Sequence, residues 1–138
     1  MANEAELKVR IENPVPYTIA DGTDIAKGAL LKLTDTRTAI ISSSGADMIA
    51  GFAAREKVAN DGRTELAVFM RGFFRVYCSG VIKIGQAISS VINHPNFVAA
   101  AGATTSGAAI IGHMLEAAGG NDRHLAYVNI GAGGNQVS

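Results

Sequence analysis

The residues that could do chemistry are few and widely separated along this chain. Its histidines are His94, His113 and His124, which fall in a predicted turn, a predicted strand and the start of another strand. No Cys-x-x-Cys, His-x-His or His-Glu-x-x-His pattern accompanies them, so the spacing supplies no third ligand for zinc. His113 and His124 could still approach each other on paired strands, because the turn predicted at Gly119–Asp122 lies between them. One function to consider is therefore that of a small β-barrel binding module or enzyme with a pocket near these two histidines. This is the alternative function.

The acidic residues and the cysteine are better explained by structure than by chemistry. Most aspartates fall in predicted turns, where the Asp side chain bonds to nearby backbone, and nothing singles out a glycosidase-like pair of carboxylates. There is no Gly-x-Ser-x-Gly elbow. Cys78 is the one cysteine, which excludes an internal disulfide, and we expect it to be a small buried apolar side chain. The sequence predicts no catalytic residue, cofactor or metal site.

The composition limits what the protein can bind. Its 12 basic and 12 acidic residues give a net charge of zero, so no basic surplus is available for nucleic acid or for an anionic membrane. Charged residues make up 17% and hydrophobic residues 48%, which favours a subunit of a larger assembly over a free monomer. The opening MANEAELKVR has no apolar signal-peptide core, and no run approaches the roughly 20 apolar residues of a membrane helix. We expect a soluble protein made in the cytoplasm.

The element around which the chain is organised is Thr64–Ser79, the longest β-favouring run, which is apolar on both faces. A half-buried strand alternates apolar and polar residues, so this run is expected to lie between two buried layers. A bend is expected at Gly72. Beyond it, we expect Phe73, Arg75 and Tyr77 to face a neighbouring subunit.

Shorter strands are predicted before and after this run, separated by turns and polar loops. The predicted strands cover residues 29–33, 38–41, 49–55, 87–92, 97–100, 109–117 and 124–130, and polar or small-residue loops are expected at 42–47 and 101–107. Only Ala54–Ala59 and Met114–Ala118 could be interpreted as helical.

The two halves of the chain match each other at their glycines. The order of strands, loops and turns is the same in each half, and the matched pairs are Gly28 with Gly85, Gly51 with Gly112, and Gly72 with Gly131. Two similar β units predict a closed or nearly closed barrel with pseudo-twofold character. We therefore expect an all-β fold with few or no helices: an arm at residues 1–16, a small β-barrel at 17–131 and a Gly-rich tail at 132–138.

The N-terminal arm contains a short strand with one apolar face. Leu7, Val9 and Ile11 alternate with charged residues, and the strand ends at Pro14. Such a strand can pair with the sheet edge of a neighbouring protein or can form an edge of its own sheet, and the sequence leaves both possibilities open. These four residues are the candidate contacts of the arm with a partner protein or a sister subunit.

Five segments, taken in order, carry a family resemblance. They are KGALLKL, MIAGFAAREKVANDGRTELAVFMRGFFRVYCS, IKIGQAIS, IIGHMLEAA and HLAYVNIG. Together they resemble the small capsid decoration (cement) proteins of tailed double-stranded DNA bacteriophages, over most of Tyr17 to Gly131. The motifs are short and glycine-based, so their order and spacing carry the resemblance. The N-terminal strand departs from the family pattern, which does not fix its role.

The resemblance implies a β-tulip type of barrel that forms homotrimers on the outside of a virion head. Such proteins resemble the head-stabilising protein of phage lambda in role: they bind the major capsid protein and clamp neighbouring capsomers. The resemblance implies no catalysis and no cofactor, and we expect no small-molecule substrate; the balanced charge already argues against nucleic acid and membrane as partners. The expected location is the capsid exterior, after synthesis in the host cytoplasm.

Overall fold

All of the regular secondary structure in the described part of the chain is β-strand. The structure is a computed structural model that describes residues 4–11, 13–41, 48–91, 94–100, 110–120 and 122–130. Within these ranges the strands are β1 (Glu6–Arg10), β2 (Val15–Thr18), β3 (Leu30–Asp35), β4 (Thr38–Ile41), β5 (Ile49–Ala53), β6 (Glu65–Phe69), β7 (Arg71–Cys78), β8 (Val81–Ile82), β9 (Ala87–Val91), β10 (His94–Ala100), β11 (Ile110–Met114), β12 (Ala118–Gly119) and β13 (Asp122–Asn129). The prediction of an all-β, barrel-like fold is confirmed.

Neither segment that could be interpreted as helical is a helix. Ala54–Ala59 contains bends and an isolated bridge, and Met114–Ala118 runs from the end of β11 to the start of β12. The loops predicted at 42–47 and 101–107 and the tail at 132–138 lie outside the described residues.

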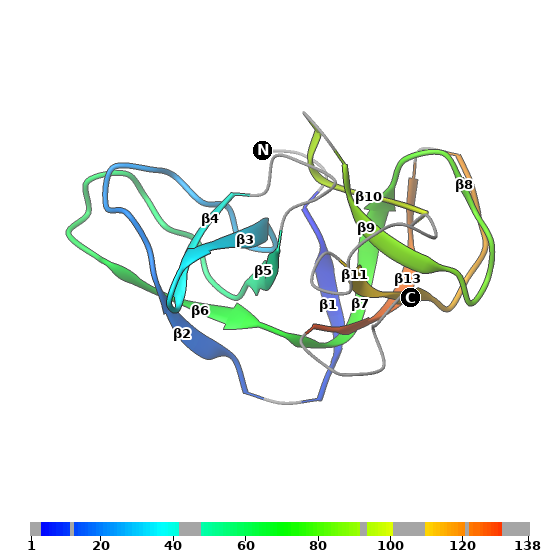
Figure 1. The fold of residues 1–138 in the computed structure, drawn as a ribbon, viewed down its shortest axis with the longest axis horizontal. Helices are drawn as coiled ribbons and strands as arrows, with labels where there is room; N and C mark the ends of the chain where they lie inside the picture. Colours follow the sequence, from blue (N-terminus) through cyan, green and yellow to red (C-terminus); the bar gives the residue numbers. More distant parts are fainter. Residues whose placement is uncertain are drawn as a thin grey trace.

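The strands close into two rings that lie side by side (Figure 1). The first is a closed barrel in the order β2-β4-β3-β5-β6. In the second, β7, β10, β9, β11 and β13 are neighbours in that order, and the pairing of β13 with β7 joins the two ends. Strand β1 pairs with β7 where the rings meet. Each of the two similar units that the glycines indicated therefore has a ring of its own.

The two rings repeat one connectivity. In the first, β2 runs parallel to β4 and antiparallel to β6; in the second, β7 runs parallel to β10 and antiparallel to β13. The predicted match of Gly28 with Gly85 is visible in the backbone. The Gly28 N–H donates to the Ala53 carbonyl and the Gly85 N–H to the Met114 carbonyl, both at 2.8 Å. Both glycines have positive φ, 86° and 81°, a conformation that glycine adopts without strain.

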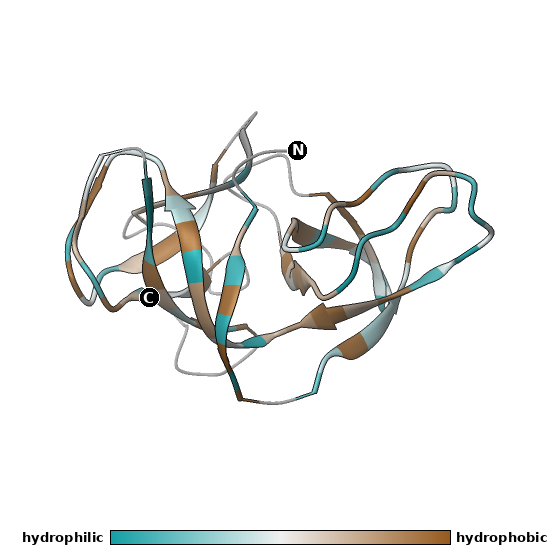
Figure 2. Cartoon of the chain, turned by 180° about the vertical axis from the view of Figure 1, so that it is seen from behind, coloured by the Kyte–Doolittle hydropathy of each residue, from teal (hydrophilic) through white to brown (hydrophobic). Residues whose placement is uncertain are grey.

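Strands β3 and β5 form a wall between two hydrophobic cores. Leu31 and Ala50 pack in the core of the first ring, whereas Leu30, Ile49 and Phe52 pack in the larger core of the second. The pairing of β5 with β3 shifts register between Ile49 and Gly51, which interrupts the alternation of the strand. Ile49 and Phe52 therefore enter the same core, and every residue of β5 is buried. Other strands have one polar face, and hydrophobic and hydrophilic segments alternate along several of them in Figure 2.

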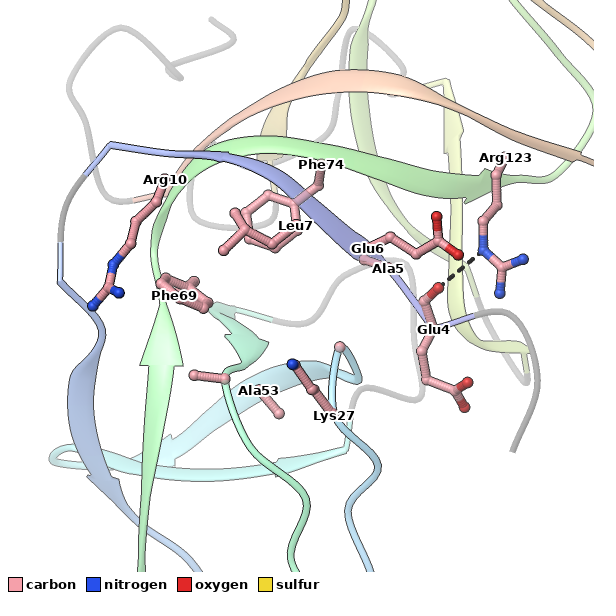
Figure 3. A pocket seen from close by; sticks show the side chains of 12 residues that line it. Glu4, Ala5, Glu6, Leu7, Arg10, Lys27, Ala53, Phe69, Phe74 and Arg123 are labelled. Carbon is pink, nitrogen blue, oxygen red and sulfur yellow. Dashed lines mark hydrogen bonds between the residues drawn. The ribbon is translucent and has the colours of Figure 1, made fainter.

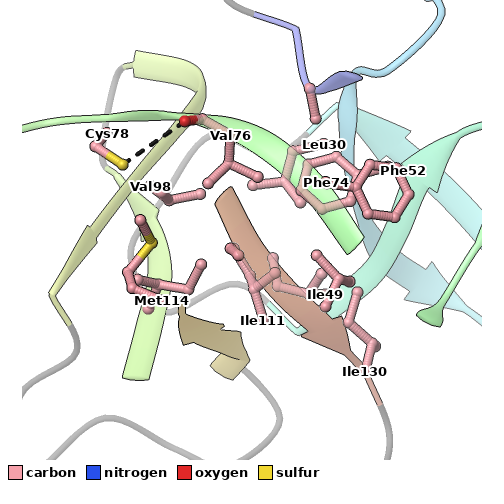
Figure 4. Packing of buried hydrophobic residues seen from close by; sticks show 14 of the residues in the cluster. Leu30, Ile49, Phe52, Phe74, Val76, Cys78, Val98, Ile111, Met114 and Ile130 are labelled. Atoms are coloured by element: carbon pink, nitrogen blue, oxygen red, sulfur yellow. Dashed lines mark hydrogen bonds between the residues drawn. The ribbon is translucent and has the colours of Figure 1, made fainter. Parts of the chain in front are cut away.

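Stacked aromatic rings join the two units. The Phe52 ring of β5 lies on the Phe74 ring of β7 with centroids 5.0 Å apart (Figure 4), and Phe69 meets Phe74 edge-on at 6.0 Å. Burying a Phe side chain contributes about 1.5–3 kcal/mol, and an aromatic pair adds about 0.5–1.5 kcal/mol. The run Thr64–Ser79 was expected to lie between two buried layers. At Phe69 and Phe74, packing within the same chain buries the side chains, and no partner protein is needed there.

Matched glycines also permit close contact between neighbouring strands. A β-carbon added at Gly51 would overlap the carbonyl oxygen of Phe69, and one added at Gly112 would overlap that of Tyr127. Backbone atoms cannot rotate away as a flexible side chain can. The glycine is therefore required for close approach at the same place in both rings.

We predict that Gly112→Ala lowers the free energy of unfolding by about 3 kcal/mol, because the new methyl group must displace the backbone of β13. Gly120→Ala is the matched control, since a β-carbon there meets no atom within 4 Å, and it should change stability by less than about 0.5 kcal/mol. Urea unfolding followed by circular dichroism measures both. Equal midpoints for the two variants would show that the β11–β13 contact tolerates a side chain.

Candidate functional site

His113 and His124 do not share a site. Strand register places His113 opposite Tyr127, and His124 opposite Val76. Since Tyr127 and His124 are three positions apart on one strand, His113 and His124 lie on opposite faces of the sheet. His124 instead has its Nδ1 atom 3.7 Å from a Glu116 carboxylate oxygen. Within the described residues, no group of three or more potential ligands is placed to hold a metal ion.

Cys78 behaves as a packing residue. Its side chain is fully buried and unpaired with another cysteine, and desolvation raises the pKa of the thiol to about 11. The reactive thiolate is therefore scarce at neutral pH. This agrees with the prediction of a small buried apolar side chain.

Phe73, Arg75 and Tyr77 lie together on one face of β7. The intervening residues of the strand point into the core, and these three are half-buried on the outside of the ring. Their partners on β13 face outward too, in the pairs Phe73–Tyr127, Arg75–Leu125 and Tyr77–Arg123. The period-two pattern thus placed the three residues on one surface, and their role in a subunit interface stays a prediction.

Aromatic rings cluster on this outer surface. The Phe73 and Tyr127 rings meet edge-on with centroids 5.6 Å apart, and His113 meets Tyr127 in the same way at 5.5 Å. Arg71 donates a hydrogen bond to the Tyr127 hydroxyl at 3.0 Å. We call Phe73, Tyr127 and His113 the aromatic face. Outer faces of a closed sheet are usually polar, so this cluster is a candidate contact surface.

The arm residues flank the same region. Strand β1 pairs antiparallel with β7 of the same chain, with Leu7 opposite Phe74 and Val9 opposite Phe73. Leu7 packs against the larger core, whereas Val9 is 50% exposed and Ile11 is 40% exposed. In the isolated chain, β1 is therefore an edge strand of its own sheet, one of the two possibilities that the sequence left open.

A groove runs between β1 and the first ring (Figure 3). It encloses about 650 Å³, and Leu7, Ala53, Phe69 and Phe74 form its apolar part. Charged side chains surround that part: Arg10 lies at the Phe69 end, and Glu4, Glu6 and Arg123 lie at the other end. Arg123 donates from Nε to the Glu4 carbonyl at 3.1 Å. We call this cavity the β1 groove.

A buried lysine organises the outer tip of the first ring. The Lys57 side chain is fully buried, and its ammonium lies 2.8 Å from an Asp21 carboxylate oxygen and 2.7 Å from one of Asp61. It also donates to the carbonyls of Asp21 and Val58, at 2.9 and 2.7 Å. The ammonium is thus surrounded by acceptors, which is what a buried charge requires.

These contacts shift the pKa values of Lys57 and Asp61. Burial alone lowers the pKa of Lys57, but the hydrogen bonds to Asp21 and Asp61 outweigh it and the net pKa is raised. The hydrogen bond from Lys57, followed by that from the Arg63 backbone N–H, holds the pKa of Asp61 well below its ordinary value. Lys57 and Asp61 are therefore both charged at neutral pH. The geometry of the cluster is that of a structural ion pair, and Lys57 also contributes to the lining of a hollow of about 390 Å³.

Sequence reasoning missed Lys57 and the groove. Lys57 lies in the polar segment REKVANDG, whose composition predicts an exposed lysine. The structural repeat reveals its special place: Ile25 bridges Lys57 in the first unit, as Ile82 pairs with Ala118 in the second. Aligning the two halves at their glycines places Lys57 opposite Ala118. This difference could have marked Lys57 as unusual from the sequence alone.

We predict that Lys57→Met lowers the melting temperature by about 10 °C near neutral pH, because two carboxylates lose their cation. Lys8→Met is the control: Lys8 is exposed and lies 3.7 Å from Glu6, and its loss should have little effect.

The lowered Asp61 pKa stabilises the fold above the ordinary carboxyl pKa of 3.8 and ceases to do so as pH falls further. The raised Lys57 pKa stabilises it below 10.5 and ceases to do so as pH rises further. The difference between wild type and Lys57→Met should therefore shrink at both extremes in calorimetry. A difference that is constant with pH would contradict this assignment.

Comparison with known proteins leaves the function to be argued from the fold and its surfaces. The chain matches no protein-family model, and no curated protein sequence is similar enough to it to mark a relative. Among the described residues, none belongs to a helix with the length and apolar character needed to cross a bilayer.

Proposed function

We propose that this protein is a capsid decoration (cement) protein of a tailed bacteriophage. In this role it binds the outer surface of the virion head as homotrimers and stabilises the shell by bridging capsomers of the major capsid protein. The proposal includes no catalytic activity and no cofactor. It rests on the ordered glycine-based segments in the sequence and on one structural observation, the aromatic face.

The aromatic face supports the proposal because it lies outside the ring, where it does not contribute to the core. Phe73 and Tyr127 are half-buried in the single chain, so an apolar partner surface would remove further area from water. Each square ångström of apolar area buried contributes about 25 cal/mol. Arg71 and Arg75 border these rings, and aromatic residues with arginine are the types enriched at protein interfaces.

The proposed mechanism is thermodynamic. A protein that binds only the assembled, expanded shell lowers the free energy of that state by RT ln(1 + [L]/Kd), which is about 4 kcal/mol when the free concentration is about 1,000 times Kd. A trimer multiplies this effect, since engagement of one subunit raises the effective concentration of the other two. The shell then resists the outward pressure of packaged DNA without any covalent change.

We predict that Phe73→Asp converts a trimer into a monomer, because three buried carboxylates cannot all be solvated at one interface. Val58→Asp is the control, since Val58 is also apolar, is 51% exposed and lies on the far tip of the first ring. Light scattering after size-exclusion chromatography gives the mass, and circular dichroism checks that the variant folds. A monomeric wild-type protein that also fails to bind heads lacking decoration protein would refute the proposed function.

A further inference from the structure

Cationic side chains gather where the β1 groove continues toward the first ring. A second hollow of about 540 Å³ adjoins the groove and shares Arg10, Lys27 and Phe69 with it. Arg55 and Arg63 complete a set of four cations, and Glu56 is the one carboxylate among the described residues that line the second hollow. In a chain with zero net charge, this concentration of positive charge is local.

Two of the four cations are held in place, and two are available for a ligand. The Arg10 guanidinium donates to the Asn13 side chain at 3.0 Å and lies 5.7 Å from the centre of the Phe69 ring. Arg63 bonds to the Asp61 carboxylate at 3.2 Å and the Glu56 carbonyl at 3.0 Å. Lys27 and Arg55 are exposed and form no ion pair with a described carboxylate.

The groove also exposes a strand edge. Strand β1 is the terminal strand of its sheet, with β7 as its neighbour on one side, and Ala5 and Leu7 line the groove on the other. A bond from the Ala5 N–H to the Gly28 carbonyl at 3.0 Å ties the start of this segment to the first ring. An unpaired strand edge is a template for an extended peptide.

We propose that the β1 groove binds an extended acidic segment of another protein, which adds to the edge of β1. Its carboxylates meet Lys27 and Arg55, with the charges of Arg10 and Arg63 beside them, and its apolar side chains contact Phe69 and Leu7. The alternation of a strand suits this arrangement, because one set of side chains faces the apolar part while the other faces the cations. Glu4 and Glu6 at the far end oppose a continuous phosphate backbone, so the groove favours a peptide over nucleic acid. This inference is separate from the trimer and from head binding.

The test uses the full chain and fluorescence anisotropy with a labelled short peptide of alternating Val and Glu. Saturable binding that weakens with added salt is expected. Arg55→Glu should weaken it by about tenfold or more, whereas Lys83→Glu, the same charge reversal at an exposed residue on the other unit, should leave it unchanged. A peptide N-methylated at alternate amides should also bind about tenfold or more weakly, because it cannot complete the ladder with β1.

Three results would overturn the proposal. They are no saturable binding of the acidic peptide, equal effects of Arg55→Glu and Lys83→Glu, and tighter binding of a labelled oligothymidine than of the peptide. The last would identify a nucleic-acid site instead. Circular dichroism of each variant separates lost binding from lost folding. The trimer and head-binding measurements do not depend on this peptide. Failure of the peptide to bind therefore leaves the proposed function intact, and failure to form trimers or bind heads leaves the peptide proposal intact.

Discussion

A strand that separates two hydrophobic cores must be apolar on both faces, and the rest of this structure depends on that constraint. β5 meets it with a register shift between Ile49 and Gly51: Ile49 and Phe52 enter the larger core, while Ala50 and Ala53 face the core of the first ring. The core of the first ring takes only the small alanine side chains from this strand. The larger core takes the aromatic residues, and the stack of Phe52 on Phe74 connects the units. The two rings therefore share a buried wall and are stabilised together.

The repeated backbone explains why glycine recurs where it does. Gly51 and Gly112 occupy equivalent strands, and each lies against a carbonyl of the next strand. Gly28 and Gly85 turn the chain with the same positive φ before β3 and β9 begin. Side chains differ between the units at matched points, as Ala53 and Met114 do. Backbone geometry is thus retained in both units, while the packing residues are adjusted to cores of different size.

Much of the fold could be predicted from the sequence, because it depends on local patterns. The long β-favouring run Thr64–Ser79 located what are two strands, β6 and β7, and the matched glycines located the repeat. The closure of each unit into its own ring could not be predicted, since strand order depends on pairings between residues far apart in the chain, such as Phe73 with Tyr127. The outward position of Phe73, Arg75 and Tyr77 follows from alternation alone. The groove does not: Arg10, Lys27 and Arg55 come together only because β1, which pairs with β7, lies beside the first ring. Lys57 was missed because its neighbours in sequence are all exposed or polar, and its acceptors come from two different loops.

The buried Lys57 has a consequence for the whole molecule. Its ring of acceptors makes the tip of the first unit polar, whereas the matched position in the second unit is Ala118, near Val81 and Ile84, which are 73% and 69% exposed. These tips lie at opposite ends of the long axis (Figure 1). A chain that repeats its backbone therefore does not repeat its surface. One end contains the charged cluster of Lys57, and the other exposes Val81 and Ile84, so the long axis of the protein has a chemical direction.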